Sequence, residues 1–152
     1  MARLPLRFYG DPILRTRCDA VETITEEIKQ LVRDMIETMD IDRGCGLAAP
    51  QIGHSLRIFV LRDYVETPQG DVTLSDPKVY INPKLSNPSV KKVSDTEGCL
   101  SIPGIRAELE RPLKIRIEAI DIEGALLQKK SKGIMLAYVC MKMITSMEFI
   151  HR

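Results

Sequence analysis

Residues 44–53 read GCGLAAPQIG, and this short segment is the most informative part of the sequence. Its closely spaced glycines allow a backbone to approach a ligand without side chains in the way. Gln51 adds an uncharged amide that can donate a hydrogen bond toward a developing oxyanion. Taken alone, however, the segment is better explained as a Gly-rich turn that carries a surface glutamine.

Residues 97–101 read EGCLS and form a second informative segment. Cys99 follows a glycine in a loop that we expect between two strands, where a thiolate can reach a metal ion or an electrophile. Taken alone, Cys99 is better explained as a buried structural cysteine. Only the combination of the two segments separates these alternatives.

Together and in this order, the two segments resemble the first two signature motifs of the peptide deformylases. The resemblance begins at GDPILR, residues 10–15, and runs to about Gly124. We therefore divide the chain into residues 1–124, which match the family, and residues 125–152, which depart from it. The resemblance implies a single domain over residues 1–152 with an α+β fold. In that fold, small mixed or antiparallel sheets pack around a central C-terminal helix, and an amphipathic helix lies near the N-terminus.

The resemblance also implies an activity, namely metal-dependent hydrolysis of the N-formyl group from the N-terminal methionine of newly made proteins. Cys99 matches the thiolate ligand of the metal, which is Fe²⁺ or else Zn²⁺, Ni²⁺ or Co²⁺. Gln51 and the backbone N–H of Leu100 match the two oxyanion donors. The implied substrate-binding residues are Gly44, Cys45, Gly46, Glu97, Gly98 and Arg106. Glu97 and Arg106 are expected to form a polar pair close to the site.

Composition agrees with one globular domain, because 44% of the 152 residues are hydrophobic and 28% are charged. With 22 basic and 21 acidic residues, the net charge of +1 gives no reason to expect nucleic acid or an acidic membrane as the partner. Neither a membrane span nor a secretory signal is predicted. The four cysteines lack a C-x-x-C pair and are expected as reduced thiols. The family resemblance adds that the chain is a bacterial-type, cytoplasmic monomer that acts on N-formyl-methionyl nascent peptides at the ribosome exit.

Hydrophobic periodicity predicts one long helix and several strands. Thr23 or Thr25 can cap the helix, and the apolar residues that follow form one stripe: Ile28, Leu31, Val32, Met35, Ile36 and Met39. Strands are predicted at residues 56–61, 79–81, 90–93 and 115–122, with the second ended by Asn82-Pro83. Residues 64–78 are predicted to be a surface loop.

The third motif of the peptide deformylases, H-E-x-x-H on a helix, is absent from this sequence. Its two histidines complete the metal site and its glutamate transfers the proton. Here the only histidines are His54 and His151, and residues 137–148 read AYVCMKMITSME where the motif is expected. Lys142 and Ser146 stand near the ligand positions, and neither suits iron or zinc. One thiolate alone is expected to hold the metal poorly.

A shifted reading frame explains the missing motif. When the bases that encode residues 140–149 are regrouped one position earlier, they permit His-Glu-Asn-Asp-His-Leu-Asn-Gly-Val, in which Glu, the second acidic residue and Gly are forced. We hypothesise a one-base shift between about Gly124 and Lys132, either real or introduced by sequencing, which also explains the early end of the chain. Sequencing the gene across this stretch tests the hypothesis.

Three functions remain open from sequence alone. The first is an active deformylase, which is the function of the family. The second is a catalytically inactive scaffold, or relic, that retains a peptide-binding cleft. The third is a non-enzymatic interaction protein in which Cys99 is redox-sensitive. For the chain as written, we expect activity far below that of the family, because two metal ligands and the general base are missing.

Overall fold

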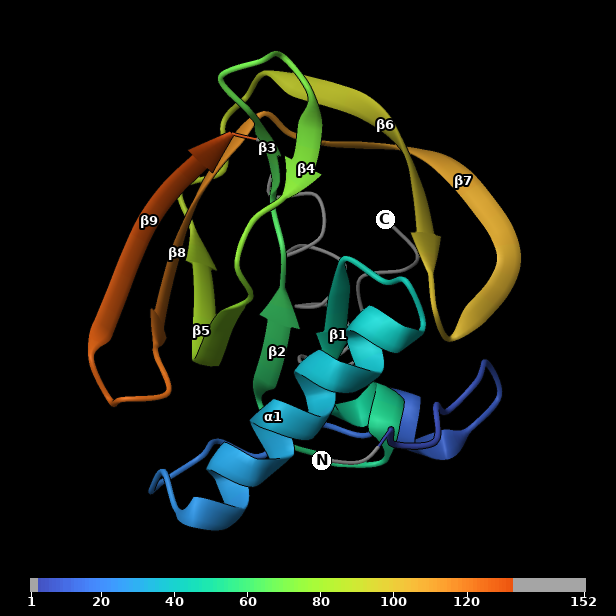
Figure 1. Ribbon diagram of the computed structural model, residues 1–152, viewed down its shortest axis with the longest axis vertical. Coiled ribbons are helices and arrows are strands. Elements are labelled where there is room, and N and C mark those ends of the chain that lie inside the picture. Colours follow the sequence, from blue (N-terminus) through green and yellow to red (C-terminus); the bar gives the residue numbers. More distant parts are fainter. Residues whose placement is uncertain (1–2, 133–152) are drawn as a thin grey trace.

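The structure is a computed structural model that describes residues 3–132. One α-helix packs against a five-stranded antiparallel sheet, and two separate two-stranded hairpins extend from that body (Figure 1). Within residues 3–132, no helix is long and apolar enough to cross a membrane.

The helix α1 spans Glu26–Ile41 and carries the predicted apolar stripe. Its N-cap is Thr25, whose hydroxyl accepts a hydrogen bond from the Ile28 N–H at 3.4 Å. The face toward the sheet buries Leu31, Val32, Met35, Thr38 and Met39. The helix contacts β1 and β2, so it closes one side of the core.

The five-stranded sheet has the strand order β1-β2-β5-β8-β9, and every neighbouring pair is antiparallel. The strand bounds are Gly46–Ala48 for β1, Ile58–Leu61 for β2, Lys78–Ser86 for β5, Lys114–Ile120 for β8 and Leu126–Lys132 for β9. β2 is buried along its whole length, as its IFVL sequence of β-branched, aromatic and leucine residues favours. Phe59 stacks on Tyr80 of β5 at a centroid distance of 4.8 Å.

The prediction that Asn82-Pro83 ends the second strand is wrong, because β5 continues to Ser86. Asn82 has a left-handed backbone, with φ of 50°, and the register with β8 shifts at this point. The Asn82 side chain accepts from the N–H of Val21 and donates to its carbonyl, each at 2.8 Å. These two bonds hold the irregularity in place and let the strand resume beyond it.

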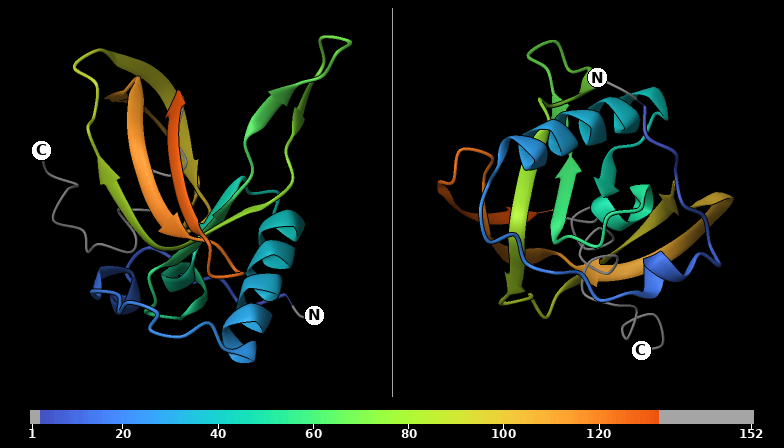
Figure 2. Two further views of the ribbon diagram at one scale, coloured as in Figure 1. Left: turned by 90° about the vertical axis from the view of Figure 1, so that its left-hand side faces the viewer. Right: turned by 90° about the horizontal axis from the view of Figure 1, so that it is seen from below.

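The two hairpins also differ from the prediction. Residues 64–78 are not simply a loop, because Tyr64–Glu66 (β3) and Val72–Leu74 (β4) pair as an exposed hairpin that stands away from the sheet (Figure 2). The predicted strand at 90–93 is the start of a longer one, β6, at Lys92–Cys99, which pairs with β7 at Ile102–Pro112. Glu97, Gly98 and Cys99, which were expected in a loop between two strands, are therefore the last residues of β6.

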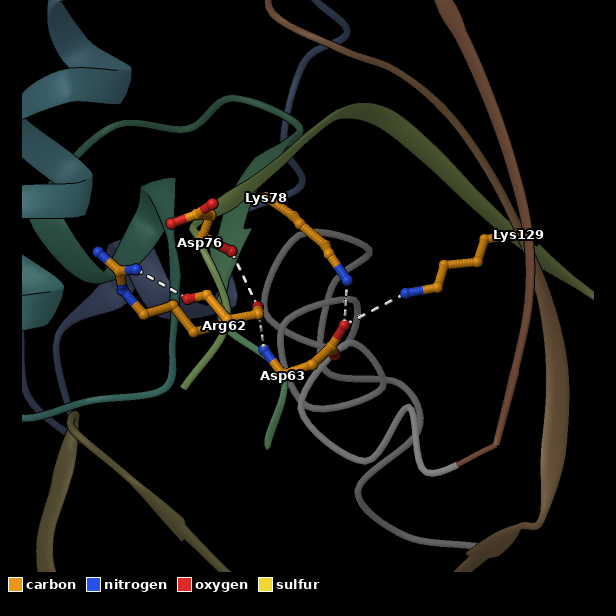
Figure 3. A network of polar contacts seen from close by, with 6 residues as sticks. Arg62, Asp63, Asp76, Lys78 and Lys129 are labelled. Atoms are coloured by element: carbon orange, nitrogen blue, oxygen red, sulfur yellow. Dashed lines mark hydrogen bonds and ion pairs between the residues drawn. The ribbon is translucent and has the colours of Figure 1, made fainter. Parts of the chain in front are cut away.

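Strand β9 was not predicted, and it brings a charged side chain to the inner side of the sheet. Lys129 lies opposite the buried Ile117, and its ammonium group is 3.2 Å from the Asp63 carboxylate, which also pairs with Lys78 (Figure 3). Burial acts to raise the pKa of the Asp63 carboxyl, but the hydrogen bonds from the two lysines outweigh it and hold that pKa below its usual value. Nearby, Arg62 donates to the Ser75 carbonyl at 2.8 Å.

The predicted C-terminal helix lies outside the described residues. This applies to the segment in which Lys142 and Ser146 stand near the expected ligand positions, and to Cys140 and His151.

Replacing Phe59 with alanine should lower the free energy of unfolding by about 3–5 kcal/mol, because this fully buried ring would leave a cavity beside Tyr80. Urea unfolding followed by circular dichroism measures the change. Phe8→Ala is the matched control, since Phe8 is 50% exposed, and it should cost less than about 0.5 kcal/mol. Equal losses in the two variants would show that Phe59 is not part of the central core.

Candidate active site

A cleft of about 670 Å³ lies where the first motif, the β3 hairpin and the β6–β7 hairpin meet. All nine residues predicted for the site line it: Gly44, Cys45, Gly46, Gln51, Glu97, Gly98, Cys99, Leu100 and Arg106. Tyr64 of β3 and Asp95 of β6 line it as well. The two sequence segments, about fifty residues apart, thus form one concave surface.

The first motif connects the end of α1 to β1, which is an edge strand of the five-stranded sheet. Gly44 lies so close to Leu100 that a Cβ at residue 44 would come within 2.6 Å of a Leu100 side-chain carbon. The chain then runs through β1 and turns in a short 3-10 helix, η2, at Ala49–Ile52. Gly53 ends η2 with φ of 87°, a conformation that favours glycine. This turn directs Gln51 back toward the second motif.

Gln51 is not a surface glutamine, because only 3% of it is exposed. Its amide oxygen accepts from the Ala48 N–H at 2.9 Å. Its amide nitrogen donates to Ser101 Oγ at 3.1 Å and to Cys99 Sγ at 3.6 Å. The Gly-rich-turn explanation of this segment is therefore wrong, and the two motifs are joined through a buried amide.

Cys99 is the last residue of β6, at a register shift where it pairs with Ile102. Burial is the main influence on its thiol and raises the pKa above the usual value, although the N–H groups of Ser101 and Ile102 and the Ser101 hydroxyl act in the opposite direction. A thiol with a raised pKa is mostly protonated at neutral pH, which does not favour the reactivity of a redox sensor.

The extended N-terminal segment forms backbone hydrogen bonds with both motifs, and sequence reasoning did not predict this contact. The Arg7 N–H donates to the Gln51 carbonyl at 2.7 Å, and the Tyr9 N–H donates to the Ser101 carbonyl at 2.8 Å. These bonds are made by backbone groups, so no side-chain pattern signals them. Their effect is to fix the main chain on both sides of the amide–thiol contact.

The expected pair of Glu97 and Arg106 is wrong, because Glu97 binds Arg111 instead. Arg111 donates Nε to one carboxylate oxygen at 3.0 Å and Nη2 to the other at 3.1 Å, and both side chains are nearly buried. Arg106 lies opposite Gly98 and is exposed along the cleft. Glu97 lies opposite Ala107, and side chains alternate between the two faces along a strand, so Arg111, four residues beyond Ala107, shares the face of Glu97 whereas the adjacent Arg106 does not.

Cys45 and Tyr64 form a contact at the rim of the cleft, with Sγ and Oη 3.1 Å apart. This hydrogen bond is the main influence that raises the pKa of the Tyr64 hydroxyl. Sequence reasoning did not find Tyr64, because it assigned residues 64–78 to a loop.

The described residues do not fit a complete catalytic metal centre. Within residues 3–132, no three His, Cys, Asp or Glu side chains are gathered so that they can hold a metal ion. Cys99 is instead surrounded by Gln51 and Ser101. Catalytic zinc sites normally use three protein ligands, so Cys99 by itself is an incomplete site.

The fold and cleft define an α+β protein with a buried amide–thiol pair at a cleft between two sheets. The family model for polypeptide deformylase matches residues 4–148. The peptide deformylase of Dictyoglomus turgidum is 43% identical over 132 residues, which cover 87% of this chain and 79% of that protein. This chain therefore belongs to the polypeptide deformylase family, a family of metal-dependent hydrolases.

Solved structures agree with this assignment. The peptide deformylase from Thermotoga maritima superposes with a TM-score of 0.84 at 31% identity, covering 95% of this chain and 93% of that one. The Met-ala-ser-bound enzyme from Acinetobacter baumannii has a TM-score of 0.84 at 25% identity, with 95% and 94% covered. The chain thus has the peptide deformylase fold, with small antiparallel sheets and one helix in the described part.

Replacing Glu97 with glutamine should lower the free energy of unfolding by about 3 kcal/mol, because the Arg111 guanidinium would keep its charge in a nearly buried position without its carboxylate. Chemical denaturation measures the loss. Glu26→Gln is the control, since the pair of Glu26 with Lys29 is on the surface and should contribute less than about 1 kcal/mol. If the two substitutions lower the free energy of unfolding equally, the Glu97–Arg111 pair does not stabilise the second motif.

Proposed function

We propose that the cleft binds N-formyl-methionyl peptides and that Gln51 and the Leu100 N–H stabilise the oxyanion when the formyl group is hydrolysed. The observation that carries the proposal is the position of Gln51 Nε2, which lies 3.6 Å from Cys99 Sγ at a cleft lined by both motifs. Preorganised donors at a buried site stabilise developing charge without reorganising as the reaction proceeds. The Met-ala-ser ligand of the A. baumannii relative supports a peptide with an N-terminal methionine as the ligand.

The proposed peptide binds through its backbone between two strands. β1 is the terminal strand in the order of its sheet, and β6 belongs to a two-stranded sheet, so both have edges at which a further strand can pair. Gly44, Cys45 and Gly46 would contact the peptide on one side and Gly98 on the other. Glycines at these positions leave room for main-chain contact. Arg106 would lie beside the bound peptide, and Glu97 would act through Arg111 by holding β6 and β7 together.

The metal of the family polarises the formyl group and activates water when it is bound. Cys99 would be one ligand, with Fe²⁺ as the expected ion and Zn²⁺, Ni²⁺ or Co²⁺ as substitutes. Because the described residues supply only this ligand and the sequence lacks H-E-x-x-H, we propose that the chain as written is impaired in catalysis. A peptide-binding scaffold without turnover is then the second candidate, supported by the same cleft.

The proposed setting follows from the family resemblance. N-formyl-methionyl chains arise during protein synthesis, so we propose nascent peptides near the ribosome exit as the substrates, in a bacterial-type cytoplasm. We further propose that the chain acts as a monomer. Size-exclusion chromatography with light scattering tests the last point.

After incubation with Fe²⁺ under anaerobic conditions, or with Zn²⁺, Ni²⁺ or Co²⁺, the purified chain should retain well under one ion per molecule, because one thiolate is too few ligands. Elemental analysis after gel filtration gives the stoichiometry. The same samples should deformylate formyl-Met-Ala-Ser at rates far below those of the T. maritima enzyme measured in parallel.

Cys99→Ala and Cys18→Ala serve as the variant and its control for this experiment. Cys18 is 4% exposed in the core, away from the cleft, so only Cys99→Ala should remove any metal that does bind. One tightly held ion per chain together with rapid deformylation would overturn the proposed impairment. Absence of any formyl-peptide binding, measured by calorimetry, would overturn the proposed substrate class.

A further inference from the structure

The buried amide of Gln51 is held in one of two possible orientations. A primary amide can rotate by half a turn and exchange its oxygen and its nitrogen at almost no steric cost. In one orientation a donor faces Cys99 and the cleft, and in the other an acceptor does. Only the first can stabilise an oxyanion. Something other than shape must therefore select the orientation.

Two groups make this selection. The Ala48 N–H is a donor only, and it occupies the Gln51 oxygen at 2.9 Å. Ser101 Oγ lies 3.1 Å from the Gln51 nitrogen and accepts one of its two protons. Ser101 is fully buried, so no water competes for that proton.

We infer that Ser101 is a positioning residue that anchors one N–H of Gln51 and leaves the other aimed at the cleft. The second N–H makes only the longer contact to Cys99 Sγ, at 3.6 Å, and it is therefore the one available to a substrate oxygen. The inference rests on the proposed oxyanion role of Gln51. According to this inference, one amide proton of Gln51 is held by Ser101 and the other is free to donate to the substrate.

The backbone explains why the anchor works from this position. Ser101 directly follows the proposed second donor, Leu100, and its carbonyl accepts from the Tyr9 N–H at 2.8 Å. The Gln51 carbonyl accepts from Arg7 in the same N-terminal segment, at 2.7 Å. Both partners of the anchoring bond thus have a fixed main chain. Removing the hydroxyl leaves a buried N–H without its acceptor, and rotation of the amide then relieves little of that loss.

The test is NMR spectroscopy of the isotope-labelled chain without substrate, with the Gln51 amide pair assigned by its loss in Gln51→Leu. In the wild-type chain, one amide proton should show a nuclear Overhauser effect to the Ser101 Hβ protons and the other should not. In Ser101→Ala, the amide protons should exchange with solvent roughly tenfold faster relative to the backbone amides of Phe59 and Val60, which report global stability.

Ser94→Ala is the matched control, because Ser94 is an exposed serine of β6 whose hydroxyl bonds Glu108 and not the cleft. It should leave the Gln51 resonances and their exchange unchanged. Exchange in Ser101→Ala that stays within about twofold of wild type, after the same correction, overturns the inference. If Ser101→Ala does not fold, the wild-type spectrum decides, since equal Overhauser effects from both protons contradict an anchored amide. No substrate is used, so the result stands apart from the test of deformylation.

Discussion

The site depends on one buried side chain, Gln51, which links two segments that lie about fifty residues apart. Its amide bonds Ser101 and Cys99 on the second motif and the Ala48 N–H on its own. The N-terminal segment binds the main chain of both motifs from the other side. A buried polar group that loses its partners costs free energy, so the two motifs keep their relative position through these contacts.

Much of the fold followed from local patterns, and the errors have tertiary causes. The apolar stripe predicted α1 because one face of a helix must meet the core. The end of β5 was misplaced because Asn82 is held by Val21, a contact between residues far apart in the chain. The β3–β4 hairpin was missed because all its side chains are exposed and no buried face creates a pattern. The site residues came from the motifs, whereas the bonds of Ser101 to Gln51 and of Arg111 to Glu97 came only from the structure.

In the function we propose, metal coordination rather than the cleft limits the chemistry. The cleft carries the amide, the glycines and the strand edges that peptide binding needs. Metal-assisted hydrolysis needs in addition two imidazoles and a base, which the sequence does not supply in the family's arrangement. The proposed peptide binding and the proposed loss of catalysis therefore rest on different parts of the chain.

The central claim is that Gln51 and Ser101 interact directly across the two motifs. A double-mutant cycle on the free energy of unfolding tests it, with Gln51→Met, Ser101→Ala and the combined variant measured by denaturation. The Ala48 N–H loses its acceptor in both variants that carry Gln51→Met, but in the combined variant neither residue 51 nor residue 101 leaves the other as an unpaired polar group, so the two single losses should fall short of adding by about 1 kcal/mol or more. Losses that add to within about 0.3 kcal/mol would contradict the claim.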